Sequence, residues 1–104
     1  MENNNNTMPE PQVVNYGIYY LITDAFINDY LACTSQMAYV DVMKVLNIVN
    51  RHNQIVSIAQ LNEIIRTIGT FPYKYVHELM KNINDDTLFV KYFIKQPEGF
   101  NPGF

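Results

Sequence analysis

Basic residues are absent from the first 43 positions of this 104-residue chain. That stretch carries five acidic side chains, whereas the remainder holds all seven Lys and Arg residues together with five acidic ones. The formal net charge of −3 is therefore divided between an acidic part and a mildly basic part. An acidic chain with scattered cations does not bind nucleic acid by charge alone, because phosphates must be met by clustered Lys and Arg. The division of charge favours contacts with proteins, a second copy included.

Cysteine occurs once, at Cys33, which excludes an internal disulfide and agrees with a reducing compartment. The chain begins without a basic segment followed by an apolar stretch, so we expect no secretory signal. Its most apolar run, 16–22, is far shorter than the roughly 18–20 residues of a membrane span. We expect a cytoplasmic protein, or one within a particle that assembles inside the cell, with no membrane contact.

Residues that could support catalysis occur without the partners they need. Cys33 has no neighbouring His or basic residue to lower its pKa. His77 and Glu78 begin a zinc-protease signature, but Lys81 stands where the second ligand must be. His52 is too distant in sequence to complete a ligand set, and four scattered glycines form no phosphate-binding loop. The sequence predicts no enzyme, no metal, no cofactor and no small-molecule substrate.

Aromatic residues are abundant while charged residues are few. Charged side chains make up 16% of the chain, against roughly 25% in a typical soluble domain, and there are eight Tyr and six Phe. A core of this size cannot fully bury so many large rings, and surface tyrosine is common at protein interfaces. An alternative of equal weight is that the rings are buried and only the tyrosine hydroxyls reach the surface.

The two ends differ in composition from the middle. Residues 1–12 show no apolar periodicity and contain two prolines, which predicts a flexible N-terminal arm. Residues 96–104 repeat a Gly-Phe pair around Asn-Pro, which predicts a flexible C-terminal tail or, alternatively, a docking peptide that orders on a partner. Residues 13–95 are then a single helical domain.

Apolar spacing predicts a mainly α fold: a small bundle of about four helices with one short C-terminal strand, or a two-stranded β element. The first helix is apolar nearly all round, and the second is expected to bury Tyr39. Ser57 and Gln60 match a capping box at the start of the third. The expected helices span about 15–32, about 36–51 and 57–69, with a fourth beginning near Thr70 and reaching Ile83.

The stretch Leu88–Lys95 alternates between two faces and contains β-branched and aromatic residues, which predicts a strand. Its only nearby partner is Gln54–Ile58. A short pairing would leave an edge open to another subunit.

These features favour a small protein-interaction or assembly module, for example an accessory or structural subunit of a larger particle such as a virus or phage. We expect a protein partner or a homo-oligomer. The candidate partner-binding residues are the tyrosines of the first helix and the aromatic residues of the tail: Tyr16, Tyr19, Tyr20, Tyr30, Phe100 and Phe104.

A DNA-binding regulator is the second hypothesis. The expected order of elements over 36–95 loosely resembles a winged helix-turn-helix domain, which implies that the fourth helix would enter the major groove. The absence of a second wing strand and of arginine on that helix ranks this reading second. The residues it would use are Lys74, Tyr75, Lys81, Lys91 and Lys95.

Overall fold

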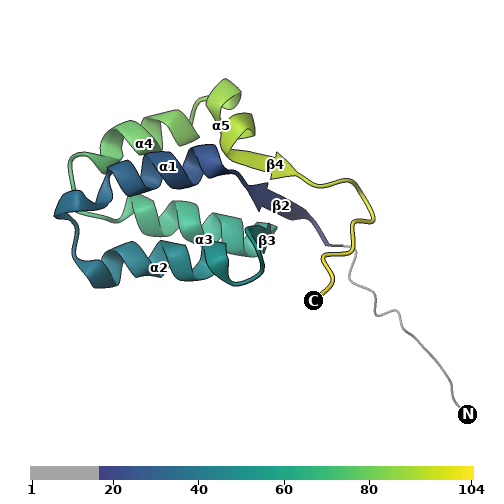
Figure 1. The fold of residues 1–104 in the computed structure, drawn as a ribbon. Helices are drawn as coiled ribbons and strands as arrows, with labels where there is room; N and C mark the ends of the chain where they lie inside the picture. Colours follow the sequence, from purple (N-terminus) through teal and green to yellow (C-terminus); the bar gives the residue numbers. More distant parts are fainter. Residues whose placement is uncertain (1–16) are drawn as a thin grey trace, which may run out of the picture.

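The computed structural model describes residues 17–104, which form five α-helices, one 3-10 turn and three short strands (Figure 1). The expected arm over 1–12 and Tyr16 lie outside the described residues. In chain order the elements are β2 (Tyr19–Ile22), α1 (Asp24–Ala32), η2 (Thr34–Gln36), α2 (Tyr39–Asn50), β3 (Ile55–Ser57), α3 (Ile58–Gly69), α4 (Val76–Ile83), α5 (Asp86–Tyr92) and β4 (Phe93–Lys95).

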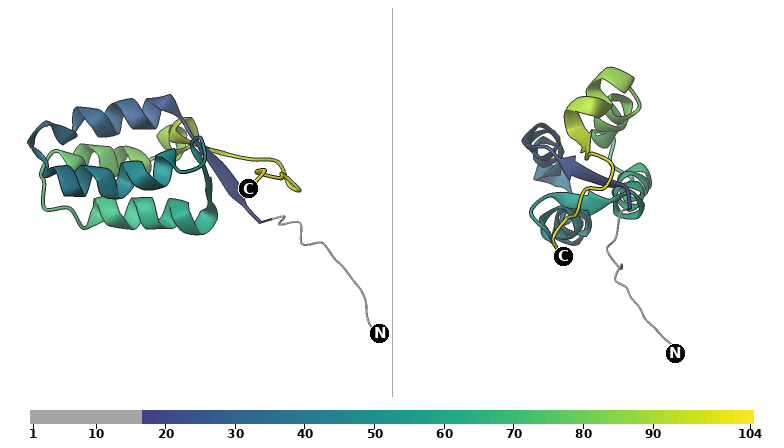
Figure 2. Two further views of the ribbon diagram at one scale, coloured as in Figure 1. Left: turned by 60° about the horizontal axis from the view of Figure 1, so that its bottom comes forward. Right: turned by 90° about the vertical axis from the view of Figure 1, so that its right-hand side faces the viewer.

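Helices α1 to α4 lie side by side as a bundle, and α5 and the strands gather at one end of it (Figures 1 and 2). The sheet is antiparallel with the order β3-β2-β4. The mainly helical prediction is confirmed, although the sheet has three strands rather than one or two. The opposite end of the bundle consists of the connections from α1 to α2 and from α3 to α4.

The first predicted helix was wrong over its first half, because Tyr19–Ile22 is the central strand β2. Tyr19–Ile22 is a continuous run of apolar and aromatic residues, which occurs in short buried strands and in buried helices alike, so periodicity alone does not separate them. The helix begins only after Thr23, whose hydroxyl accepts a hydrogen bond from the amide of Phe26. The same hydroxyl donates to the carbonyl of Lys91 at 2.6 Å, which ties the start of α1 to α5.

The predicted strand Leu88–Lys95 was also wrong over most of its length. Asp85 caps a helix there: its carboxylate accepts from the amides of Thr87 (2.9 Å) and Leu88 (3.3 Å) and starts α5. Only Phe93–Lys95 is extended. This strand pairs with β2, with Ile22 opposite Phe93, and not with the expected Gln54–Ile58.

The third helix agrees closely with the spacing that predicted it, whereas α2 lies within the expected range but exposes Tyr39, which was expected to be buried. The capping box of α3 is present, with the Gln60 amide donating to Ser57 Oγ at 3.2 Å and the Ser57 amide donating to Gln60 Oε1 at 2.9 Å. The fourth helix begins at Val76 and not near Thr70, since 71–75 form the turn that precedes it.

The core is built around aromatic rings where α1 meets the C-terminal elements. Phe26 is fully buried and stacks on Tyr30 with ring centroids 6.0 Å apart. Its other neighbours are Tyr92 at 5.6 Å and Phe93 at 5.1 Å. Helices α2, α3 and α4 add aliphatic side chains, among them Val45, Ile64, Ile68 and Leu79. A core rich in rings leaves fewer of them for the surface than the composition suggested.

Candidate protein-interaction site

A groove of about 250 Å³ lies between α1 and α4 and contains the single cysteine. Burial raises the pKa of the Cys33 thiol, and the nearby Asp29 carboxylate raises it further. The thiol is therefore held protonated at neutral pH, the reverse of what a nucleophile needs. The groove is lined by Asp29, Ala32, Cys33, Glu78, Leu79 and Asn82.

Two polar side chains of this groove, those of Asp29 and Asn82, hydrogen-bond to Tyr92 within the fold. Tyr92 donates its hydroxyl hydrogen to the Asp29 carboxylate and accepts a hydrogen bond from the side-chain amide of Asn82. Burial raises the pKa of Tyr92, and its hydrogen bond to Asp29 adds to the effect. Within residues 17–104, no three His, Cys, Asp or Glu side chains gather closely enough to hold a metal ion. None of the helices in this part of the chain is both long and apolar enough to cross a membrane.

The expected partner-binding tyrosines do not form one surface. Tyr30 is fully buried, and its hydroxyl donates to the carbonyl of Val42 at 3.0 Å. Tyr19 is buried in β2 and Tyr20 is half-buried, with its ring against Phe89. The tyrosine face expected on the first helix is therefore mostly interior. Phe100 and Phe104 pack against Tyr19 of their own chain.

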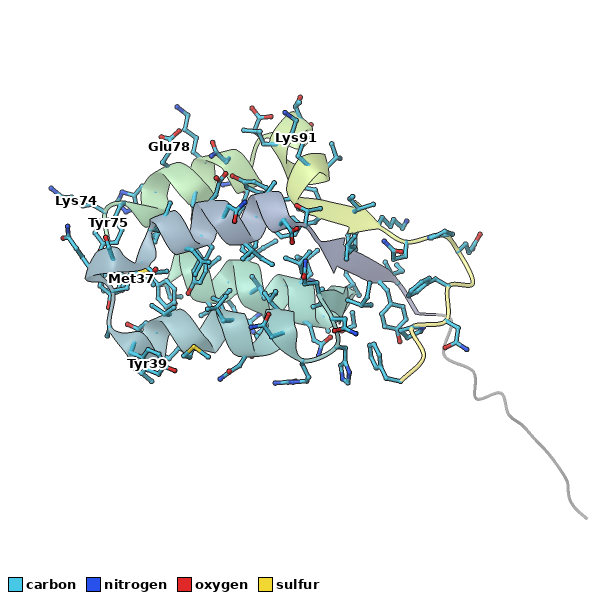
Figure 3. All side chains as sticks on the ribbon, viewed as in Figure 1. Met37, Tyr39, Lys74, Tyr75, Glu78 and Lys91 are labelled. Carbon is cyan, nitrogen blue, oxygen red and sulfur yellow. The ribbon has the colours of Figure 1, made fainter. Side chains whose placement is uncertain are left out.

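The residues of the DNA-binding hypothesis lie on several separate elements. Lys81 lies on α4, Lys91 on α5 and Lys95 on β4, while Lys74 and Tyr75 precede α4. All four lysines are exposed, with the carboxylate of Glu78 among them on α4 (Figure 3). In the described chain, α5 follows α4 where a winged domain would continue into its wing strands, and β4 pairs with β2 alone. The two-stranded wing implied by the resemblance is therefore not formed by the described residues.

Among the described residues, the two most exposed large apolar side chains lie instead at the end of the bundle opposite the sheet. Tyr39 is 78% exposed and Val40 is 64% exposed, at the first two positions of α2. Leu31, near the end of α1, is 45% exposed. Tyr73 and Tyr75 add half-buried rings from the connection between α3 and α4, stacked 5.7 Å apart. We call these five residues the aromatic end; Figure 3 labels two of them, Tyr39 and Tyr75.

The aromatic end is held in place by a hydrogen-bonded brace. The N-cap residue of α2 is Ala38, whose methyl side chain cannot accept a hydrogen bond from the first turn. Tyr73 compensates from the neighbouring connection: its hydroxyl donates to Asp41 Oδ2 at 2.8 Å and accepts from the Ala38 amide at 3.2 Å. Lys44 forms an ion pair with Asp41 at 3.0 Å. The Tyr73 hydrogen bond and Lys44 hold the pKa of Asp41 below its usual range.

Sequence analysis missed this site because it expected Tyr39 to be buried. The buried stripe of α2 is formed by Val45, Ile48 and Val49, so Tyr39 and Val40 extend past its end toward solvent. The sequence held one signal for this exposure. Tyr39 and Val40 are adjacent, and an amphipathic helix buries only part of its circumference, so two adjacent apolar residues do not both fit on a narrow buried stripe.

Comparisons of this chain with models of protein families, with curated proteins and with solved structures gave no match.

Proposed function

We propose that this chain is a non-enzymatic protein-interaction module that binds its partner through the aromatic end. The observation that carries the proposal is the exposure of Tyr39 and Val40, two large apolar side chains at adjacent positions. Exposed apolar residues that are contiguous mark interaction sites, whereas single ones are ordinary. Val90 on α5, at 63% exposure, lies between the half-buried Phe89 and the exposed Lys91 and provides a comparison of matched exposure.

The composition of the aromatic end supports a protein as the partner. Tyrosine contributes a large ring at low entropic cost and is enriched where interfaces are energetically important. The brace from Tyr73 orients the first turn of α2 in advance, so less ordering is required on binding. Lys74 is exposed beside Tyr75 at this end (Figure 3) and favours a partner whose apolar groove carries an acidic residue at its rim.

Site-specific photo-crosslinking in the native host tests the proposal. A photoreactive phenylalanine derivative replaces Tyr39 in one variant and Val90 in the other, because both side chains are exposed and neither is part of the core. We expect one dominant adduct with a separate protein from position 39 and none from position 90. Equal labelling from the two positions, or no adduct from position 39, would refute the aromatic end as the binding site. An adduct of twice the chain's own mass would show that the partner is a second copy of this chain and not a separate protein.

A further inference from the structure

The C-terminal segment, residues 96–104, folds back toward its own sheet (Figures 1 and 2). The Phe100 ring lies 6.1 Å from that of Tyr19, and the Phe104 ring lies 6.2 Å from it on an edge-to-face approach. Phe104 also stacks on His52 with the centroids 3.7 Å apart and the planes 7° from parallel. Tyr19 and His52 therefore form an acceptor site for the two phenylalanines.

The acceptor site lies on the sheet face that the helices do not cover. Successive strand residues point to opposite faces, and Ile22 of β2 points into the core together with its partner Phe93. Tyr19 is an odd number of residues from Ile22, so it points the other way. The segment thus provides cover for the outer face.

Beyond Gln96, aromatic rings and not backbone hydrogen bonds to other described residues hold the segment against the rest of the chain. The Gln96 amide donates to the Tyr19 carbonyl at 2.9 Å. Beyond it, the hydrogen bonds of residues 97–104 with other described residues stay inside the segment, from the Phe100 amide to Pro97 and from the Gly103 amide to Asn101. Detaching the segment therefore costs ring contacts and leaves its internal hydrogen bonds in place.

The segment also keeps its own shape. Gly99 and Gly103 take φ values of 81° and 83°, which are strained for other residues, so each turn depends on its glycine. Pro97 and Pro102 restrict φ at two further positions. A segment that is turned in advance loses little entropy when it docks, on whichever copy it docks.

We propose that residues 97–104 are an exchangeable docking segment, which occupies the Tyr19 and His52 site of its own chain or that of a second copy. The contacts are the same in both cases, because the two copies are identical. Docking within one chain benefits from an effective concentration in the millimolar range, so exchange needs a comparably high local concentration. Such concentrations occur where copies are gathered in an assembly. The proposal does not rest on the aromatic end, which lies at the opposite end of the bundle.

A peptide-binding experiment on the full-length chain tests the acceptor site. The double variant Phe100→Ala with Phe104→Ala keeps the site but lacks the rings that fill it. The probe is a synthetic peptide of residues 96–104 carrying Phe104→Trp, whose emission is unambiguous because the chain contains no Trp. We expect the double variant to bind this peptide at least about tenfold more tightly than the wild-type chain, whose own segment competes. Adding His52→Ala to the double variant should abolish most of the gain.

Equal peptide binding by the wild-type chain and by a double variant with an unchanged circular dichroism spectrum would overturn the acceptor site. Exchange between copies is measured by sedimentation velocity from about 10 μM to about 1 mM. The upper limit matches the millimolar effective concentration of the segment for its own chain. We expect association of the wild-type chain at the upper concentrations and its loss in the double variant. Identical association of the two chains, or none up to the highest concentration, would overturn exchange. Val40→Asp at the aromatic end should leave peptide binding unchanged, so the two proposals can fail separately.

Discussion

Replacing Tyr30 with Phe is expected to lower the stability of the protein near neutral pH and to raise it, relative to wild type, at alkaline pH. The ring is fully buried, and its hydroxyl donates to the Val42 carbonyl at 3.0 Å. Near pH 8 the variant loses this hydrogen bond, which should lower the free energy of unfolding by about 1 kcal/mol. The buried packing of the ring is retained, so no cavity contributes to the loss.

Alkaline pH acts on the wild-type chain in the opposite direction. Burial raises the pKa of Tyr30, and the Asp41 and Cys33 charges add to the effect. Between the unfolded and folded pKa values, the folded state keeps a proton that the unfolded chain has released, so stability falls as pH rises. The loss from Tyr30 amounts to about 1.4 kcal/mol for each pH unit above about 10. Tyr30→Phe removes this loss and should equal or exceed the wild-type stability by about pH 11.

Urea unfolding followed by far-ultraviolet circular dichroism at intervals from pH 8 to pH 11.5 measures both effects. Tyr39→Phe is the matched control because it removes the hydroxyl of an exposed ring, and we expect it to follow the wild-type curve. A constant difference between Tyr30→Phe and wild type across this range would refute the reasoning. It would mean that Tyr30 ionises as readily in the folded state as in the unfolded chain.

Three further predictions concern helix capping, acid stability and DNA. Ser57→Ala should lower the free energy of unfolding by about 1 kcal/mol in urea titrations, with Gln60→Ala costing less; an unchanged midpoint would contradict the capping box. The pKa of Asp41 is lowered in the fold, so its contribution is present above about pH 4 and is lost as pH falls through the folded value. Tyr73→Phe should flatten that acid-side decline in thermal melts, and an identical decline would exclude the brace as its cause. Micromolar protein should not shift duplex DNA at low salt, whereas a shift that weakens with added salt would restore the helix-turn-helix hypothesis.

Local signals were sufficient for the elements that depend on local interactions. The capping box and the helical spacing from Ile58 to Ile68 predicted α3 because the capping hydrogen bonds lie within one turn and the spacing places the apolar side chains on one face. The same local logic failed at Tyr19–Ile22, since a central strand and a buried helix share an all-round apolar pattern. What decides in favour of a strand is pairing with β3 and β4, which are distant in sequence.

The second failure has a different physical cause. Asp85 can close a turn or cap a helix, and the alternation after it was compatible with a strand. The helix is favoured because it buries Tyr92 against Phe26, a contact that spans most of the chain. Both candidate surfaces depend on tertiary arrangement in the same way: Tyr39 is exposed because the buried stripe of α2 is turned away from it, and Phe104 finds His52 only through the fold.

The central claim is that the partner binds through the aromatic end. The most direct test is to measure the affinity of the partner identified from position 39 for Val40→Asp and Val90→Asp variants of equal stability. Val40 and Val90 are almost equally exposed, so the two substitutions change the surface alike and differ in location. A carboxylate in an apolar contact costs more than about 1.4 kcal/mol, so Val40→Asp should weaken binding at least about tenfold while Val90→Asp leaves it within about twofold. Equal affinities for the two variants would contradict the assignment of the aromatic end as the surface through which this protein functions.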